Sequence, residues 1–314
     1  MSAQIPYGHE KAIYKDSSIF VAWATGCSVQ RGLQNIADSS NGFATAGDPT
    51  DATGKADGIT VVSLGDGGSA VLTFDKPIFN GNGSDFAVFE NGFPFGNDST
   101  FFLELGFVEV SSDGINYFRF PSASLTDTLV QIGNGDGIDP NALRNLAGKY
   151  MVNYGTPFDL EELKNSPGLD VNHITHVKII DVVGSLVNSF ARRDSANRKI
   201  NDPWPTPFAS CGFDLDAVGV IHQFDPGGID EINTAGNSWK VYPQPAKRNE
   251  IFFIETGTEK TESVELFNFC GELMQAQLST GNVLTFDPGN VEQGIYFLRI
   301  KTGSSVLVKK LLVN

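Results

Sequence analysis

Residues 177–183 read Val177-Lys178-Ile179-Ile180-Asp181-Val182-Val183, and this stretch indicates the fold class. In an extended strand, successive side chains point to opposite faces of the sheet, so this stretch is apolar on both sides. Such strands are typical of the inside of a β-sandwich. Similar strands, bounded by Gly, Asp, Asn or Pro, are expected at 19–24, 59–64, 69–74, 86–90, 101–110, 117–121, 176–183 and 213–222.

Two short segments favour helix instead. Asp139–Leu146 and Pro157–Lys164 each span about two turns, and Asp159 with Glu162 three residues later forms a capping-box pattern. Apart from these, the 34 glycines and 24 phenylalanines indicate tight turns between aromatic-rich strands. The sequence therefore predicts an all-β protein.

The charge is unevenly distributed. Residues 239–314 contain eight basic and eight acidic side chains, so the whole net charge of −15 belongs to residues 1–238. An acidic surface repels phosphates, which argues against nucleic-acid binding, and it attracts hard cations where carboxylates cluster. No stretch of about 18 apolar residues is present, so we expect no membrane span.

The N-terminus and the cysteines suggest export. Met1-Ser2-Ala3-Gln4 resembles a start methionine joined to the last residues of a cleaved leader. A longer exported precursor is therefore expected. The three cysteines permit one disulfide at most. Two alternatives stay open: three buried thiols, or a Cys27–Cys211 bridge formed in an oxidising compartment.

The C-terminal quarter contains four ordered motifs. These are Trp239–Ala246 (WKVYPQPA), the turn in Val264–Leu273, Gly294–Ile300 (GIYFLRI) and the basic, apolar end Val306–Asn314. Their order resembles the type A sorting domain of the type IX secretion system of Bacteroidota. The resemblance implies an immunoglobulin-like fold over 239–314, contact with the type IX secretion machinery, and release or display at the cell surface. Residues 223–238 are then a linker and 1–222 the exported cargo.

The cargo region also resembles a known group. Leu64–Phe74, Asn80–Gly92, Val108–Gly114, Tyr154–Leu160 and Gly212–Val220 look like segments of an uncharacterised group of bacterial cell-surface proteins. That group is similar to galactose-binding-like jelly rolls. The similarity implies a jelly-roll-like β-sandwich, sugar binding and a structural Ca²⁺ ion.

Several predicted strands contain carboxylates. Asp214 and Asp216 alternate within one strand and so share a face, and Asp85, Glu90 and Asp181 flank or interrupt others. Buried carboxylates need partners, and Ca²⁺ is one such partner, since it takes six to eight oxygens. Salt bridges and backbone N–H groups are the alternative. A second acidic segment, Asn134–Asp139, imitates part of an EF-hand but lacks its first and last ligands, which favours a surface turn.

Aromatic side chains in Pro- and Gly-rich segments are the candidate ligand contacts. Trp204, Phe93 and Phe95 lie in such segments, where a ring can stack on a sugar or another flat ligand. The alternative is that they cap the core.

The function predicted from these features is non-catalytic binding of a glycan or another small extracellular ligand. Two alternatives are capture of a cofactor-like small molecule for an outer-membrane uptake system, and glycoside hydrolysis. Hydrolysis would need two carboxylates at a defined separation, such as Glu90 with Glu104, Glu109 or Asp181. We predict no catalytic residue.

Overall fold

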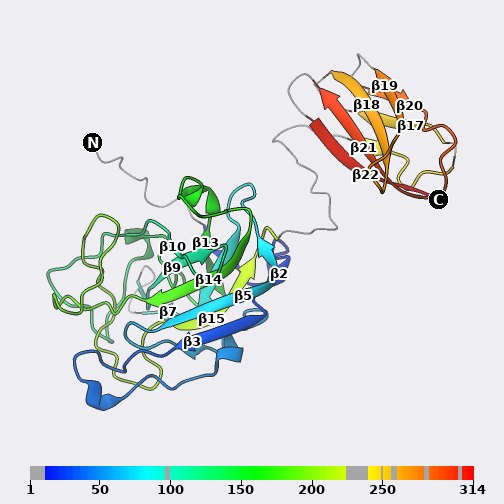
Figure 1. The fold of residues 1–314 in the computed structure, drawn as a ribbon. Coiled ribbons are helices and arrows are strands. Elements are labelled where there is room, and N and C mark those ends of the chain that lie inside the picture. Colours follow the sequence, from blue (N-terminus) through cyan, green and yellow to red (C-terminus); the bar gives the residue numbers. More distant parts are fainter. Residues whose placement is uncertain are drawn as a thin grey trace. The chain divides into compact units, whose positions relative to one another are not determined.

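The computed structural model describes residues 11–95, 100–223, 240–248, 250–255, 260–278, 283–302 and 306–314. The chain divides into two compact units, residues 1–224 and 225–314. Both consist of β-strands, and the described helices are single 3-10 turns (Figure 1). The expected all-β class is therefore confirmed. Of the predicted linker 223–238, only Gln223 lies within the described residues.

The first unit is a sandwich of two antiparallel sheets (Figure 1). The first sheet has the order β1 (Ile13–Tyr14), β13 (Tyr154–Phe158), β6 (Phe86–Glu90), β15 (Asp214–Val220) and β2 (Ala22–Trp23), with β4 (Val62–Ser63) also paired to β15. The second has the order β10 (Phe118–Arg119), β9 (Gly106–Ser111), β14 (Ile174–Asp181), β5 (Ser69–Ile78) and β3 (Gly26–Gln30).

This connectivity is that of a jelly roll. From β4 to β6 the chain changes sheet at every strand, β9 and β10 form a hairpin in the second sheet, and β13, β14 and β15 alternate again. The resulting neighbours are β4-β15-β6-β13 in one sheet and β5-β14-β9-β10 in the other. This is the arrangement of eight strands folded as two interleaved Greek keys. The predicted jelly-roll-like sandwich is thus confirmed.

Aromatic side chains form much of the core between the two sheets. Phe86 and Phe158, from neighbouring strands of the first sheet, stack with ring centroids 5.4 Å apart. Phe120 packs against both rings, at 6.0 and 5.0 Å. All three are fully buried. Each such ring removes 150 Å² or more from water, on the order of 2–3 kcal/mol relative to exposure.

The two predicted helices are largely wrong. Pro157 belongs to β13, and only Leu160–Leu163 form a 3-10 turn. Asp159 caps that turn by accepting from the Glu161 N–H, whereas Glu162 pairs with Arg144 instead of closing a capping box. In the other segment Pro140–Ala142 form one 3-10 turn, and the short strand β12 (Leu143–Arg144) follows.

The predicted strand 101–110 is divided into two. β8 (Phe101–Phe102) pairs with β7 (Phe93–Pro94) in a separate small ribbon, and the chain enters the second sheet only at β9. Between them, Leu103, Glu104 and Leu105 are buried outside any strand. The interruption places a ribbon with phenylalanines, and a buried glutamate, at one end of the sandwich.

The second unit has two sheets. Its strands are β16 (Lys240–Tyr242), β17 (Phe252–Glu255), β18 (Thr261–Asn268), β19 (Leu273–Leu278), β20 (Val283–Phe286), β21 (Gly294–Thr302) and β22 (Val306–Val313). They pair as β16-β17-β20 and β19-β18-β21-β22. This is a seven-stranded immunoglobulin-like sandwich in which the fourth strand, β19, lies beside the third instead of the fifth. Phe252, Phe286, Leu298 and their neighbours form its core. The predicted fold of this unit is confirmed.

All three cysteines are free thiols. The alternative of a Cys27–Cys211 disulfide is therefore wrong. The alternative of three buried thiols is also wrong in one respect: Cys211 is buried and Cys27 partly buried, but Cys270 is exposed.

Candidate functional site

A cavity of about 360 Å³ opens beside the β7–β8 ribbon, where β6 ends and β15 begins. Its walls combine aromatic rings with amides, hydroxyls and carboxylates. The lining residues are Asn91, Phe93, Phe102, Glu104, Asn134, Thr206, Phe208, Ser210 and Asp214. Residues far apart in the sequence thus meet at one place.

Phenylalanine rings supply the apolar part of the cavity. Phe93 and Phe102 are directly opposite in the β7–β8 ribbon, and their rings stack with centroids 4.9 Å apart and planes 10° from parallel. Phe93 is 47% exposed, and Phe208 is 52% exposed. Large aromatic faces left in contact with solvent at a cavity are a common feature of ligand-binding sites.

The polar part includes two acids, Asp214 and Glu104, and the amide of Asn91. Asp214 accepts a hydrogen bond from the Ser63 hydroxyl and another from Asn91 Nδ2 at 3.1 Å. Glu104 is only 6% exposed, and its Oε1 accepts one long hydrogen bond, 3.4 Å, from the Thr206 hydroxyl. Its Oε2 has no hydrogen-bond partner among the described residues. A further donor can therefore bind Glu104.

Burial and mutual repulsion make these acids weak. Burial, followed by the nearby charges of Asp214 and Glu90, raises the pKa of Glu104 well above its usual range. Burial and the Asp214 charge do the same to the pKa of Glu90, which is buried at the end of β6. Burial also raises the pKa of Asp214, against the hydrogen bonds from Ser63 and Asn91. The cavity is thus built around a group of carboxyls.

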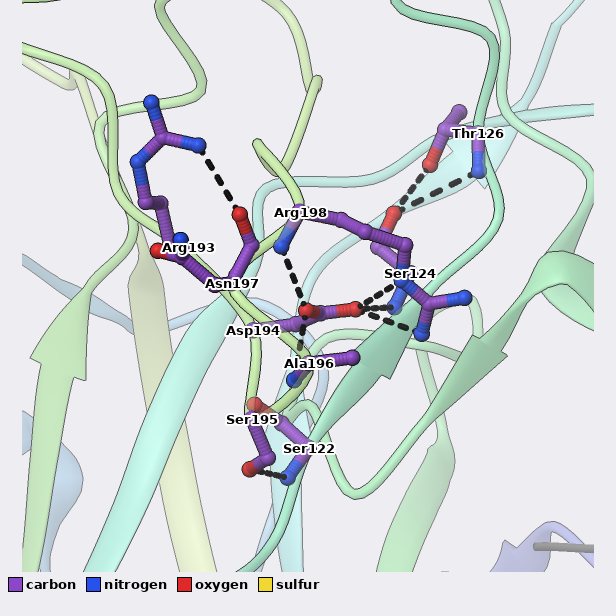
Figure 2. A network of polar contacts seen from close by, with 9 residues as sticks. All are labelled: Ser122, Ser124, Thr126, Arg193, Asp194, Ser195, Ala196, Asn197 and Arg198. Atoms are coloured by element: carbon purple, nitrogen blue, oxygen red, sulfur yellow. Dashed lines mark hydrogen bonds and ion pairs between the residues drawn. The ribbon is translucent and has the colours of Figure 1, made fainter. Parts of the chain in front are cut away.

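The long segment between β14 and β15 carries Thr206, Phe208 and Ser210, and a polar network fixes its first part. Figure 2 shows the Asp194 carboxylate between residues 195–198 and residues 122–126. It accepts from the backbone N–H groups of Ser124, Ala196 and Arg198, at 3.0, 2.9 and 2.9 Å, and pairs with the Arg198 guanidinium at 2.6 Å. Burial raises the pKa of Asp194, but these donors bring it below its usual range.

Two further anchors hold the segment closer to the cavity. Asn201 donates to the carbonyls of Asp127 and Val130 and accepts from the Ile132 N–H. Asp202 accepts from the Leu105 N–H at 3.0 Å, directly beside Glu104. Because these hydrogen bonds hold the segment before Phe208 in place, we expect the Phe208 ring to be presented from a rigid backbone. A pre-formed site loses less entropy on binding.

Of the three predicted aromatic contacts, only Phe93 lines this cavity. Trp204 lies in the same segment as Phe208, but its indole Nε1 donates to Asp66 at 3.1 Å and its ring packs against Phe190. Phe95 follows β7 and is half-buried, with backbone hydrogen bonds to Thr100.

The five predicted metal ligands are not gathered at one place. Asp214 lines the cavity with Glu90 close to it. Asp181 accepts hydrogen bonds from three backbone N–H groups, and Asp216 accepts from two. Asp85 accepts from two backbone N–H groups and from His222 Nδ1 at 2.7 Å. Among the described residues, no three His, Cys, Asp or Glu side chains form a metal site. Calcium binding stays a prediction from the sequence.

Seven cavity residues were not among the predicted ligand contacts or metal ligands: Asn91, Phe102, Glu104, Asn134, Thr206, Phe208 and Ser210. A carboxylate in an apolar predicted strand is unusual, so Glu104 stands out in the sequence, either as one of a hydrolytic pair or as a buried acid that needs a partner. Asn134, considered for an EF-hand-like turn, lines the cavity, while Asp136 accepts from the Gly133 N–H within that turn.

The C-terminal unit matches a known family. Residues 240–314 match the model described as "Secretion system C-terminal sorting domain". This confirms the predicted type IX sorting domain and identifies a secreted or cell-surface protein that interacts with the secretion machinery. In the part of the chain that the structure describes, no helix has the length and apolarity needed to cross a membrane.

The remaining comparisons carry no functional argument. No curated protein matches the chain at a significant level. Among solved structures, CopC from Methylosinus trichosporium OB3b shares 14% identity over 25% of this chain and 94% of its own, with a TM-score of 0.20. A Ruminococcus gnavus β-glucuronidase shares 14% identity over 99% of this chain and 47% of its own, with a TM-score of 0.22. The BSP domain of a biofilm associated protein shares 10% identity over 78% of this chain and 48% of its own, with a TM-score of 0.21. The chain thus spans about half the length of the last two.

Proposed function

We propose that the first unit binds a glycan, without turnover, in the cavity between the β7–β8 ribbon and Phe208. One observation carries the proposal: two solvent-exposed phenylalanine rings, Phe93 and Phe208, line the same cavity as two buried carboxyl groups, Glu104 and Asp214. The apolar C–H face of a sugar ring packs well on an aromatic ring. Sugar hydroxyls donate hydrogen bonds, and carboxylates are strong acceptors for them.

The rest of the chain is consistent with this role. The sorting domain directs the protein to the cell exterior, where free and surface-attached glycans occur. The jelly-roll connectivity agrees with the resemblance of residues 1–222 to galactose-binding-like domains. The segments that carry the cavity are anchored by hydrogen bonds, which suits a rigid binding site.

A glycan array probed with the full chain tests the proposal. Phe208→Ala removes an exposed ring and should weaken binding about tenfold or more, because a lost aromatic contact costs about 1.5–3 kcal/mol. Phe43→Ala is the matched control, since Phe43 is 59% exposed and does not line the cavity. Equal binding by wild type and Phe208→Ala would contradict the proposed site.

Two additions separate the alternatives. Repeating the array in EDTA shows whether binding requires calcium. Mass spectrometry of the bound glycan after prolonged incubation tests turnover, and shortened glycan would contradict the non-catalytic reading and favour hydrolysis.

A further inference from the structure

The described residues that line the cavity carry charge of one sign only. None of its nine lining residues is Lys, Arg or His, whereas Glu104 and Asp214 face it and Glu90 lies close behind. Arg31 is the cation that acts on Asp214, but it does not line the cavity. Its guanidinium donates to the backbone carbonyls of Ala46, Ser63 and Gly47. The carboxyls in the cavity therefore have no cationic partner among the lining side chains that the structure describes.

Glu104 is the side chain that most needs a partner. It is more than nine-tenths buried, it makes one long hydrogen bond to a hydroxyl, and Oε2 is left without a protein donor in the described part of the chain. The ionised form of a buried carboxyl group with so few donors is unfavourable, so the cavity on its own favours protonated Glu104. A ligand that supplies a positive charge and several N–H donors offsets that cost and favours the carboxylate.

We propose that the ligand carries a protonated primary amine, as in an amino sugar of the glucosamine type, and that its ammonium group binds between Glu104 and Asp214. An ammonium group donates three hydrogen bonds and accepts none, which matches carboxylates. The faces of Phe93 and Phe208 add attraction for a cation. A hydroxyl or an acetylated amine in the same place lacks the charge and leaves Glu104 uncompensated. This inference rests on the proposed glycan binding.

Isothermal titration calorimetry of the full chain with three tetrasaccharides tests the inference. The probes are a glucosamine tetramer, its N-acetylated form and cellotetraose, which has hydroxyls in place of the amines. We expect the glucosamine tetramer to bind at least about tenfold more tightly than the other two, since charge-assisted hydrogen bonds are roughly twice as strong as neutral ones.

Variants assign the preference to the cavity. Glu104→Gln should abolish it, so that the glucosamine tetramer binds no more tightly than its N-acetylated form. Glu109→Gln, on the outer face of the second sheet where Glu109 pairs with Arg119, changes the net charge equally and should retain it. This control matters because a chain with a net charge of −15 attracts cations everywhere. If Glu104→Gln does not fold, Ser210→Lys places a competing ammonium on an exposed lining residue and should abolish the preference too.

The outcomes are distinct. Equal binding of the three tetrasaccharides overturns the inference and leaves glycan binding standing. A preference that survives in Glu104→Gln, or in Ser210→Lys where the former is unfolded, assigns it to the general surface charge and also overturns the inference. No binding of any glycan, here or on the array, refutes the proposed function and the inference together.

Discussion

Asp181 offers a stringent test of how the sandwich end is held together. Its side chain is 3% exposed and accepts from the backbone N–H groups of Gly67, Val183 and Phe213 at 2.8, 2.8 and 2.9 Å. Gly212, with φ +67°, turns the chain so that the Phe213 N–H reaches the carboxylate. One side chain thus satisfies buried donors from three segments that converge at the end of the sandwich.

The cost of removing it follows from these bonds. A buried donor left without a partner costs about 1–3 kcal/mol. In Asp181→Asn, the amide oxygen can take the position of Oδ2 and keep two donors, while the amide nitrogen faces the Phe213 N–H. We therefore expect a loss of about 1–3 kcal/mol in the free energy of unfolding. Asp181→Ala leaves all three donors unpaired, and about 3–5 kcal/mol is expected once water reaches some of them.

Urea unfolding of the full chain, followed by tryptophan fluorescence, measures these losses. Asp113→Asn is the matched control, because the exposed Asp113 also accepts from two backbone N–H groups, those of Ile115 and Asn116. Water replaces its bonds, so its effect should be smaller than that of either Asp181 variant. A loss below about 1 kcal/mol in Asp181→Ala would refute the reasoning.

Two other predictions concern acid and thiol chemistry. Burial raises the pKa of Asp216 to about 6, and burial with neighbouring carboxylates raises that of Glu104, so the folded chain binds more protons than the unfolded chain above about pH 4. The free energy of unfolding should then fall as the pH rises from about 4 to 6 and beyond. Thermal unfolding should therefore occur at a higher temperature at pH 5 than at pH 7.5, and a lower unfolding temperature at pH 5 would contradict this prediction. Burial raises the pKa of Cys27 to about 11 and that of Cys211 to about 12, whereas Cys270 is exposed. A thiol reagent should therefore label Cys270 quickly in the native protein, and Cys27 and Cys211 only after denaturation. Fast labelling of Cys27 and Cys211 in the native protein would contradict this prediction.

The sequence predicted the all-β class and several strands well, because these depend on local patterns. The strand at 86–90 has the expected bounds. The helix predicted at 157–164 was wrong, because Pro157 and the Asp159/Glu162 spacing imitate a helix start, whereas Pro157 and Phe158 belong to β13. There, pairing with β6 in the first sheet outweighs the local preference.

The candidate site was only partly predictable. Phe93 and Asp214 stand out locally, one as an aromatic in a turn-rich segment and the other as a carboxylate in a strand. Phe102 and Phe208 come together with them only through the interruption at 103–105 and the anchored segment before β15. Asp85, Asp181 and Asp216 attracted attention as metal ligands, but their partners are backbone N–H groups whose positions no sequence pattern reveals.

A crystal structure of the protein soaked with the glycan that binds most tightly on the array is the most direct test of the central claim. The account predicts a sugar ring against Phe93 or Phe208, with polar groups in hydrogen-bond contact with Glu104 and Asp214. A glycan bound elsewhere would contradict it, for example in the shallow groove formed by Ser28, Gln30, Tyr117 and Lys178 on the second sheet.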